Sequence, residues 1–221
     1  MPRSSKAHAG KDLLSARSRN VWGALVATMT LLGGALYAMD GKASPRIDGM
    51  NLPALIAPAA ATSVEVIFNT KAPLDAKQWQ AIVIHHTGSP YATPQSLESE
   101  AHANGLAGLG YHFVIGNGNG LDDGELHVGS RWLRQQPGAH AIGPKADWYN
   151  RNSIGICLVG NGDRGRFTDA QMRRLTQLVD ALCRELDIPR ERIVLQDDLV
   201  KGAGPGRYFP GAAFREQLAL P

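Results

Sequence analysis

The stretch Ala81–Gly88, A-I-V-I-H-H-T-G, decides how the rest of the chain is interpreted. Ile82–Ile84 are apolar and β-branched, which predicts a buried strand, and His85 and His86 follow where that strand ends. A strand end is a rigid support beside a solvent-facing loop, where imidazoles can hold a metal or polarise a carbonyl. An isolated histidine pair more often only hydrogen-bonds backbone, so the other segments must decide between the two interpretations.

The basic charge of the chain is concentrated in its first 20 residues. These residues hold five basic side chains and one acidic side chain, a net charge of +4, whereas the whole chain carries +3. The remainder therefore sums to −1. The domain therefore lacks the excess of basic residues that is typical of a nucleic-acid-binding surface, and we expect no nucleic-acid partner.

The segment Val21–Met39 predicts a transmembrane helix. It has no charged residue across 19 positions, which is enough for a helix to cross a bilayer of about 30 Å. Trp22 and Tyr37 lie near its two ends, where interfacial aromatics are common. The basic residues 1–20 predict a cytoplasmic tail, a single-pass anchor in the cell membrane and a periplasmic or otherwise extracytoplasmic C-terminal domain. The alternative is a signal peptide cleaved near residues 41–43.

The remaining chain divides into a linker and one domain. Residues 40–62 are rich in Ala, Pro and Gly, which indicates a linker rather than a packed element. In the domain, residues 63–221, strands are expected at 63–68, 111–115, 125–128, 153–159 and 193–195, and helices at about 93–105 and 168–186. This alternation predicts an α/β fold with a central mixed β-sheet flanked by helices.

Two cysteines, Cys157 and Cys183, fall in an apolar strand-like run and on the apolar face of a predicted helix. An exported domain permits a disulfide, but buried free cysteines are common in cores. We expect two free thiols in preference to a bridge, and their spacing is not that of a metal site.

Five segments follow one another in an order that suggests a family. They are I-V-I-H-H-T-G at 82–88, G-Y-H-F-V-I-G-N-G-N-G at 110–120, G-A-H-A at 138–141, N-S-I-G-I-C-L-V-G at 152–160 and P-G-R-Y-F-P at 205–210. Together they resemble the zinc-dependent N-acetylmuramoyl-L-alanine amidases, a group that includes the peptidoglycan recognition proteins. The resemblance implies a sheet flanked by helices and a groove that holds peptidoglycan or a muropeptide.

The resemblance also implies roles for single residues. Enzymes of this family hold zinc with three protein ligands, and the metal activates water against the amide between the lactyl group and L-alanine. His85 matches the first ligand, and Tyr111 matches the tyrosine that assists the developing oxyanion. The remaining matches are expected to contact substrate: His86, Thr87, His140 and Asn152.

The chain departs from the family pattern at the other two ligands. Where similar sequences carry a second histidine and, eight residues later, a cysteine or aspartate, this chain has Gln196 and Gly204. A neutral amide is a poor substitute for imidazole, and glycine has no side chain to offer. We therefore predict a membrane-anchored domain that binds peptidoglycan and needs no cofactor. We prefer an inactive amidase to an active one.

Two other interpretations stay open. The first is an active amidase with a rewired zinc site that uses Asp198, which on an extended segment shares the direction of Gln196 while Asp197 points away. His102 and His112 are further imidazoles without an assigned role. The second is a structural domain that has lost ligand binding.

Overall fold

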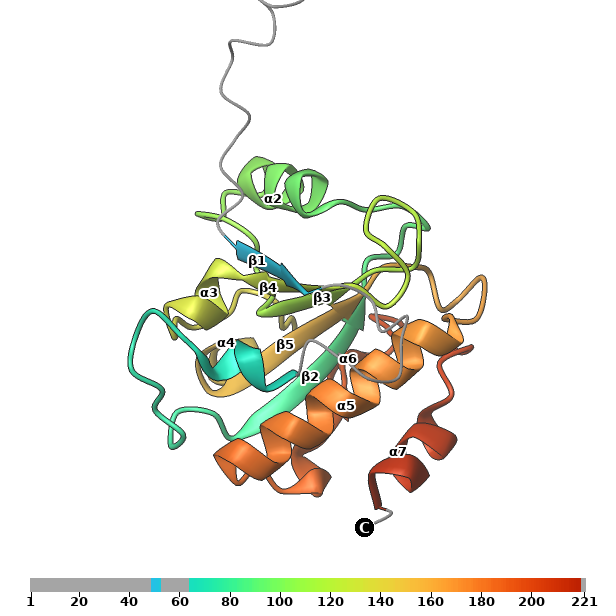
Figure 1. Ribbon diagram of the computed structural model, residues 1–221. Coiled ribbons are helices and arrows are strands. Elements are labelled where there is room, and N and C mark those ends of the chain that lie inside the picture. Colours follow the sequence, from blue (N-terminus) through green and yellow to red (C-terminus); the bar gives the residue numbers. More distant parts are fainter. Residues whose placement is uncertain (1–48, 53–63, 220–221) are drawn as a thin grey trace, which may run out of the picture. The chain divides into compact units, whose positions relative to one another are not determined.

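The computed structural model describes residues 49–52 and 64–219, which lie in one compact unit, Ile47–Pro221 (Figure 1). The predicted membrane segment Val21–Met39 lies outside the described residues. Within the described part, the helices are all too short or too polar to cross a bilayer.

The described strands form one mixed sheet. Their order across the sheet is β1-β4-β3-β5-β2-β6. The pairs β3–β5, β5–β2 and β2–β6 are parallel, whereas β3–β4 and β4–β1 are antiparallel. The predicted mixed sheet is thus confirmed. The strands are β1 Gly49–Leu52, β2 Ala81–His86, β3 Phe113–Ile115, β4 Leu126–Gly129, β5 Ser153–Leu158 and β6 Ile193–Leu195.

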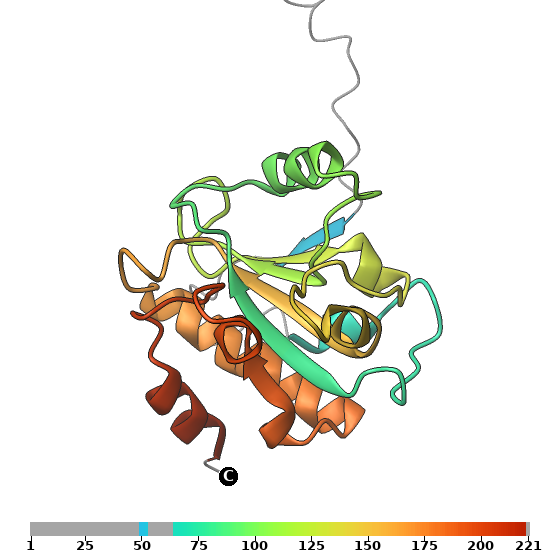
Figure 2. The same ribbon diagram turned by 180° about the vertical axis from the view of Figure 1, so that it is seen from behind.

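Helices cover both faces of the sheet. Helix α2, Pro94–Ala103, lies on one face, and α5, Asp169–Leu186, lies on the other (Figures 1 and 2). Helix α5 begins with a capping box: the Thr168 hydroxyl accepts from the Gln171 N–H at 3.0 Å, and the Gln171 side chain accepts from the Thr168 N–H at 3.1 Å. The other described helices are η1 Val64–Phe68, α3 Ser130–Leu133, α4 Ala146–Asn152, η2 Arg190–Arg192, α6 Gln196–Leu199 and α7 Gly211–Ala219.

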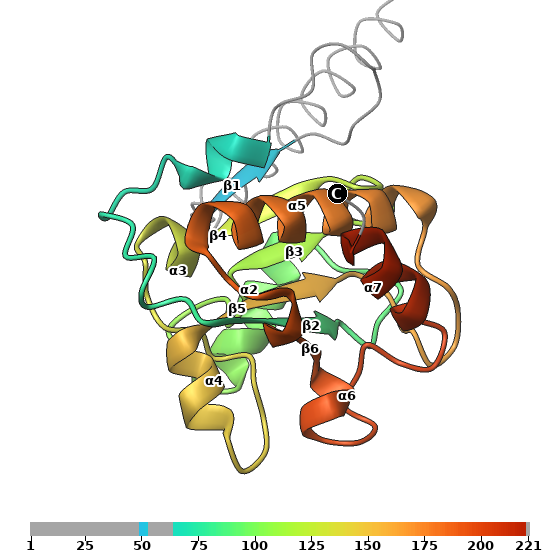
Figure 3. The same cartoon turned by 90° about the horizontal axis from the view of Figure 1, so that it is seen from below.

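The larger part of the core lies between the sheet and α5. Leu175, Leu178 and Leu182 repeat at helical spacing and are fully buried, so one face of α5 packs on the apolar side chains of β2 and β5. Figure 3 shows α5 crossing the strands with α7 beside it. A smaller apolar cluster, which includes Val114 and Cys157, lies on the α2 face of the sheet.

The pleat of β2 separates the two histidines. Alternate residues of a strand point to opposite faces, and Ile84 belongs to the core under α5. His85 is paired in register with Cys157 of β5, which packs in the cluster under α2. His85 therefore lies on the α2 face, and His86 lies on the face of Ile84.

Two sequence expectations about the start of the domain are wrong. Residues 64–68 form the 3₁₀ helix η1 rather than a strand, because this segment packs against α5 instead of pairing with the sheet. Its Ile67 carbonyl accepts the indole N–H of Trp132 at 2.7 Å. Four residues of the predicted linker, Gly49–Leu52, form strand β1 on the edge of β4.

A third correction concerns the segment after β6. The predicted extended conformation is helix α6, and the Asp198 carboxylate accepts the Leu195 N–H at 2.9 Å as the residue that caps it. Asp198 also pairs with Arg215 of α7 at 3.2 Å. Both cysteines are buried free thiols.

Candidate functional site

A groove of about 250 Å³ lies on the α2 face of the sheet. Its α2 wall presents Leu97, Glu100 and Asn104, and Tyr111 and His140 line it from segments next to β3 and β5. Thus residues far apart in the sequence meet at one place. The other lining residues are Thr87, Ala101, Leu106, Leu109, Gly110, Ala139 and Ile142.

His85 and His140 form a buried hydrogen-bonded pair beside this groove. His85 Nε2 lies 3.0 Å from His140 Nδ1, and the ring centroids are 5.0 Å apart. Burial is the main cause that lowers the pKa of both imidazoles, that of His140 to about 4. Both rings are therefore neutral at neutral pH.

The hydrogen-bond network assigns a tautomer to each ring. His140 Nε2 lies 3.3 Å from the Ser153 carbonyl oxygen, which can only accept, so His140 carries its proton on Nε2. Its Nδ1 is then an acceptor, and His85 Nε2 must donate to it. This leaves the lone pair of His85 on Nδ1, for which the described residues provide no hydrogen-bond donor.

The loop that carries His140 is held rigidly. The Asn150 side-chain oxygen accepts the N–H groups of His140 and Ala141, both at 2.8 Å. The His140 ring packs where Gly138 and Gly155 have no side chain, since a Cβ on either residue would overlap it. The glycines of G-A-H-A and N-S-I-G thus make room for this imidazole.

Tyr111 completes the cluster. Its ring centroid is 5.2 Å from that of His85. The adjacent Cys157 thiol is the largest cause that raises the pKa of Tyr111 well above its usual value, and burial adds to it. The hydroxyl is therefore protonated at neutral pH and lies against the Cys157 thiol.

The structure brings some predicted site residues together and separates others. Thr87 lines the groove, but its hydroxyl also donates to the Gly160 carbonyl at 3.2 Å. His86 lies on the opposite face, where its Nδ1 accepts the Gly162 N–H at 2.9 Å. Asn152 precedes β5 at the end of the sheet away from His85, and its amide donates to Trp148 O. The structure therefore places Tyr111, His140 and Thr87 in the lining of the groove, with His85 bonded to His140 beside it, but not His86 or Asn152.

Gln196 follows β6, next to β2. Its neighbour Leu195 is paired with Ile84, so Gln196 and His85 occupy adjacent strand ends. The Gln196 amide donates to the Ile142 carbonyl at 3.3 Å. Its Oε1 atom is buried and has no hydrogen-bond partner among the described residues.

Gly204 is unsuited to be a metal ligand because of its backbone conformation as well as its missing side chain. Its φ is +106°, a conformation that side-chain-bearing residues rarely adopt. A Cβ at this position would lie 2.9 Å from Cδ2 of His86. Gly204 thus packs against the His86 ring in a conformation suited to glycine.

These residues do not fit a three-ligand zinc site. Such a site needs three imidazole, thiolate or carboxylate ligands around one ion, and the three family positions offer one imidazole, one neutral amide and no side chain. Elsewhere in the described residues, no group of three His, Cys, Asp or Glu could surround one metal ion. Asp198, the predicted substitute, is turned toward Arg215.

Sequence reasoning did not find three residues that shape the site. Asn150 holds the His140 loop, Glu100 lies on the groove wall, and Cys157 contacts Tyr111. The positions of Leu97, Glu100 and Asn104, three or four residues apart on a predicted helix, place them on one face. The amphipathic pattern of α2 was the signal for Glu100, but which face meets the groove depends on the fold.

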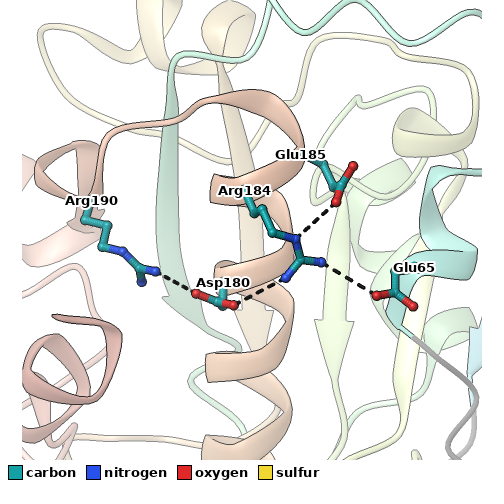
Figure 4. Close-up of polar contacts among 5 residues, drawn as sticks. All are labelled: Glu65, Asp180, Arg184, Glu185 and Arg190. Carbon is teal, nitrogen blue, oxygen red and sulfur yellow. Dashed lines mark hydrogen bonds and ion pairs between the residues drawn. The ribbon is translucent and has the colours of Figure 1, made fainter. Parts of the chain in front are cut away.

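A larger cavity, about 820 Å³, lies between α5, η2 and α7. Part of its wall is a chain of ion pairs in which Asp180 contacts Arg184 and Arg190, and Arg184 also contacts Glu65 and Glu185 (Figure 4). These charged groups satisfy one another and are about half exposed. We therefore place the functional site at the groove, where polar groups converge without such mutual pairing.

Comparisons with known proteins identify relatives. The family model of N-acetylmuramoyl-L-alanine amidase (Amidase_2) matches residues 75–207. The endolysin of Enterobacteria phage T3 is 40% identical over 83 residues, which is 35% of this chain and 47% of the endolysin. Peptidoglycan-recognition protein SC2 of Drosophila melanogaster is 33% identical over 112 residues, 46% of this chain and 54% of that protein. The chain thus spans about half the length of the curated relatives it matches.

Solved structures agree with the fold. The N-acetylmuramoyl-L-alanine amidase LysC from Clostridium intestinale superimposes with a TM-score of 0.55 at 27% sequence identity. The match covers 68% of this chain and 92% of that one. The sheet and the helices around it are therefore shared over nearly the whole of the solved amidase.

The buried imidazoles predict that acid destabilises the fold. Burial lowers the pKa of His112 to about 3, whereas an unfolded histidine titrates near about 6.5. Between these values the unfolded chain binds more protons, so the free energy of unfolding should fall as pH drops from about 6.5 toward 4, by roughly 1.4 kcal/mol per unit of pKa difference. Urea unfolding across this range measures it. In the His112→Gln variant the free energy of unfolding should fall less over this pH range than in the wild type. An equal fall in the two proteins would contradict the prediction.

Proposed function

The chain belongs to the N-acetylmuramoyl-L-alanine amidase family, and we propose that it binds peptidoglycan or muropeptides in the groove without cleaving them. The observation that carries the proposal is the contrast between two parts of the site. Tyr111, His85 and His140 form an ordered cluster, whereas the other two positions where the family holds its metal are Gln196 and Gly204.

Binding is supported by the character of the groove. It combines apolar side chains such as Leu97 and Ile142 with the Tyr111 hydroxyl, His140 and the Asn104 amide. Pockets that bind small molecules typically have this mixture. One curated relative is a peptidoglycan-recognition protein by name. A glycan–peptide fragment offers the amides, hydroxyls and methyl groups that such a surface can contact.

Impaired catalysis is supported by the donor set. Hydrolysis of an amide at neutral pH by this family's chemistry needs a metal-activated water and three protein ligands. His85 alone matches a ligand, and the conformation of Gly204 disfavours any side chain there. Tyr111 could still bind a carbonyl oxygen, but the site has no group placed to activate water.

The alternative function is an active amidase with a rewired metal site. Two observations favour it: the buried Gln196 Oε1 has no partner among the described residues, and the lone pair of His85 Nδ1 is free to coordinate. Two neutral donors would still need further ligands from outside the described cluster. Measuring zinc in the purified protein separates the two proposals.

The location of the domain is part of the proposal. The uncharged segment Val21–Met39, with a basic flank before it, supports an anchor in the cell membrane and a domain outside the cytoplasm. Peptidoglycan lies on that side of the membrane, so the address agrees with the ligand.

Our first test of this function is co-sedimentation of the full-length chain in detergent with insoluble peptidoglycan. Tyr111→Ala and Ile142→Ala remove groove contacts and should each weaken retention, Tyr111→Ala by roughly fivefold or more. Tyr208→Ala is the matched control, because Tyr208 is exposed and lies outside the groove. Equal retention of all four proteins would show that the groove is not the binding surface.

A second test measures zinc and amide cleavage. After dialysis the protein should hold well under one zinc per chain and release no stem peptide from muropeptides. Gln196→His alone should not restore zinc, since it gives two ligands. Combining it with Gly204→Cys should also fail, because the new side chain meets the His86 ring in a strained conformation. Stoichiometric zinc together with chelator-sensitive cleavage in the unmodified protein would establish the alternative.

A third test concerns the membrane. The full-length chain should stay with the membrane fraction after a high-salt wash, and a reporter fused after residue 221 should be exported. A shortened chain in the soluble fraction would show instead that residues 21–39 are a cleaved signal peptide.

A further inference from the structure

The described part of the groove is lined by one acidic side chain and by no lysine or arginine. Among the described residues that line it, Glu100 is the one carboxylate, and none is a lysine or arginine. The groove therefore presents a single negative charge to any ligand.

Glu100 faces the groove because of its place on α2. Leu97, Glu100, Ala101 and Asn104 all line the groove, and their spacing of three and four residues puts them on one helix face. The Glu100 carboxylate lies close enough to Tyr111 to affect it: after the Cys157 thiol and burial, its negative charge is a further cause of the raised pKa of Tyr111.

No described cation neutralises Glu100. The described ion pairs do not include it. Arg131 lies behind the groove wall, but its guanidinium donates to the Leu109 carbonyl at 2.8 Å and to the Pro137 carbonyl at 2.6 Å. Its charge is thus committed to main-chain oxygens and is not presented to a ligand carboxylate.

An unpaired carboxylate in a groove favours ligands with a cationic hydrogen-bond donor and disfavours anions. Resting on the proposed function, we propose that Glu100 selects muropeptides and stem peptides that carry a free primary ammonium group. The groove can meet this group in two forms. One is the α-ammonium of alanine in a peptide already released from the lactyl group, and the other is the side-chain ammonium of a diamino acid in the stem.

The experiment titrates the full-length protein in detergent with synthetic stem tripeptides. The first carries both an alanine α-ammonium and a lysine side chain. The second is N-acetylated at alanine, the third has norleucine in place of lysine, and the fourth has both changes. Glu100→Gln removes the charge with little change of shape, and Glu98→Gln is the matched control, because Glu98 is on the same helix but does not line the groove.

Because Glu100 is exposed, we expect Glu100→Gln to weaken binding of the first peptide by about two- to fivefold at low salt, and to leave the fourth peptide unaffected. Glu98→Gln should bind like the wild type. If acetylation abolishes the effect of Glu100→Gln, the ammonium is that of alanine; if norleucine abolishes it, the ammonium is that of the side chain.

Failure of this inference differs from failure of the proposed function. If Glu100→Gln binds every peptide as the wild type does, or if the wild type retains peptidoglycan but prefers the fourth peptide, ammonium selection is overturned and peptidoglycan binding stands. If the wild type binds neither peptides nor insoluble peptidoglycan, the proposed function itself is overturned.

Discussion

The hydrogen bond between His85 and His140 is the interaction on which the site depends. It joins the end of the interior strand β2 to a loop 55 residues later in the chain, and it requires the loop to approach the sheet closely. Gly155 makes this approach feasible because it has no side chain under the His140 ring, and Asn150 fixes the loop by accepting two of its N–H groups. With both rings buried, the cost of charging either one keeps them neutral, so the direction of the hydrogen bonds and the tautomers are defined.

The parts of the fold with strong local patterns were predictable from the sequence. The capping box and apolar repeat of α5 specify its start and its buried face, and the apolar run of β2 specifies a buried strand. Weak patterns failed where tertiary contacts decided the outcome. The alternating residues 64–68 became a 3₁₀ helix because the packing surface available to them is α5. The composition of residues 40–62 hid strand β1, which forms through backbone bonds to β4 that composition does not reveal.

The same reasoning explains which site residues were predictable. Motif matching found Tyr111 and His140, because their neighbours follow the family's pattern. It could not find that His86 faces the other side of the sheet, although the two-residue period of a strand implies it once β2 is known to extend to His86. Asp198 is engaged elsewhere for a different reason: an aspartate three residues after the last strand residue is well placed to accept the N–H at a helix start, and Asp198 bonds the Leu195 N–H and pairs with Arg215.

The groove and the positions where the family holds its metal draw on different segments of this fold, so one can change without the other. The described groove wall comes from residues 87–142, whereas two of the three family metal positions lie at 196 and 204. The connection between them is the bond from the Gln196 amide to the Ile142 carbonyl. Glutamine keeps this support for the His140 loop while offering only a neutral oxygen where the family has an imidazole. A substitution by a small apolar residue would have removed both the ligand and the support. Glutamine at this position therefore keeps a contact that supports the groove, in agreement with the binding role that we propose.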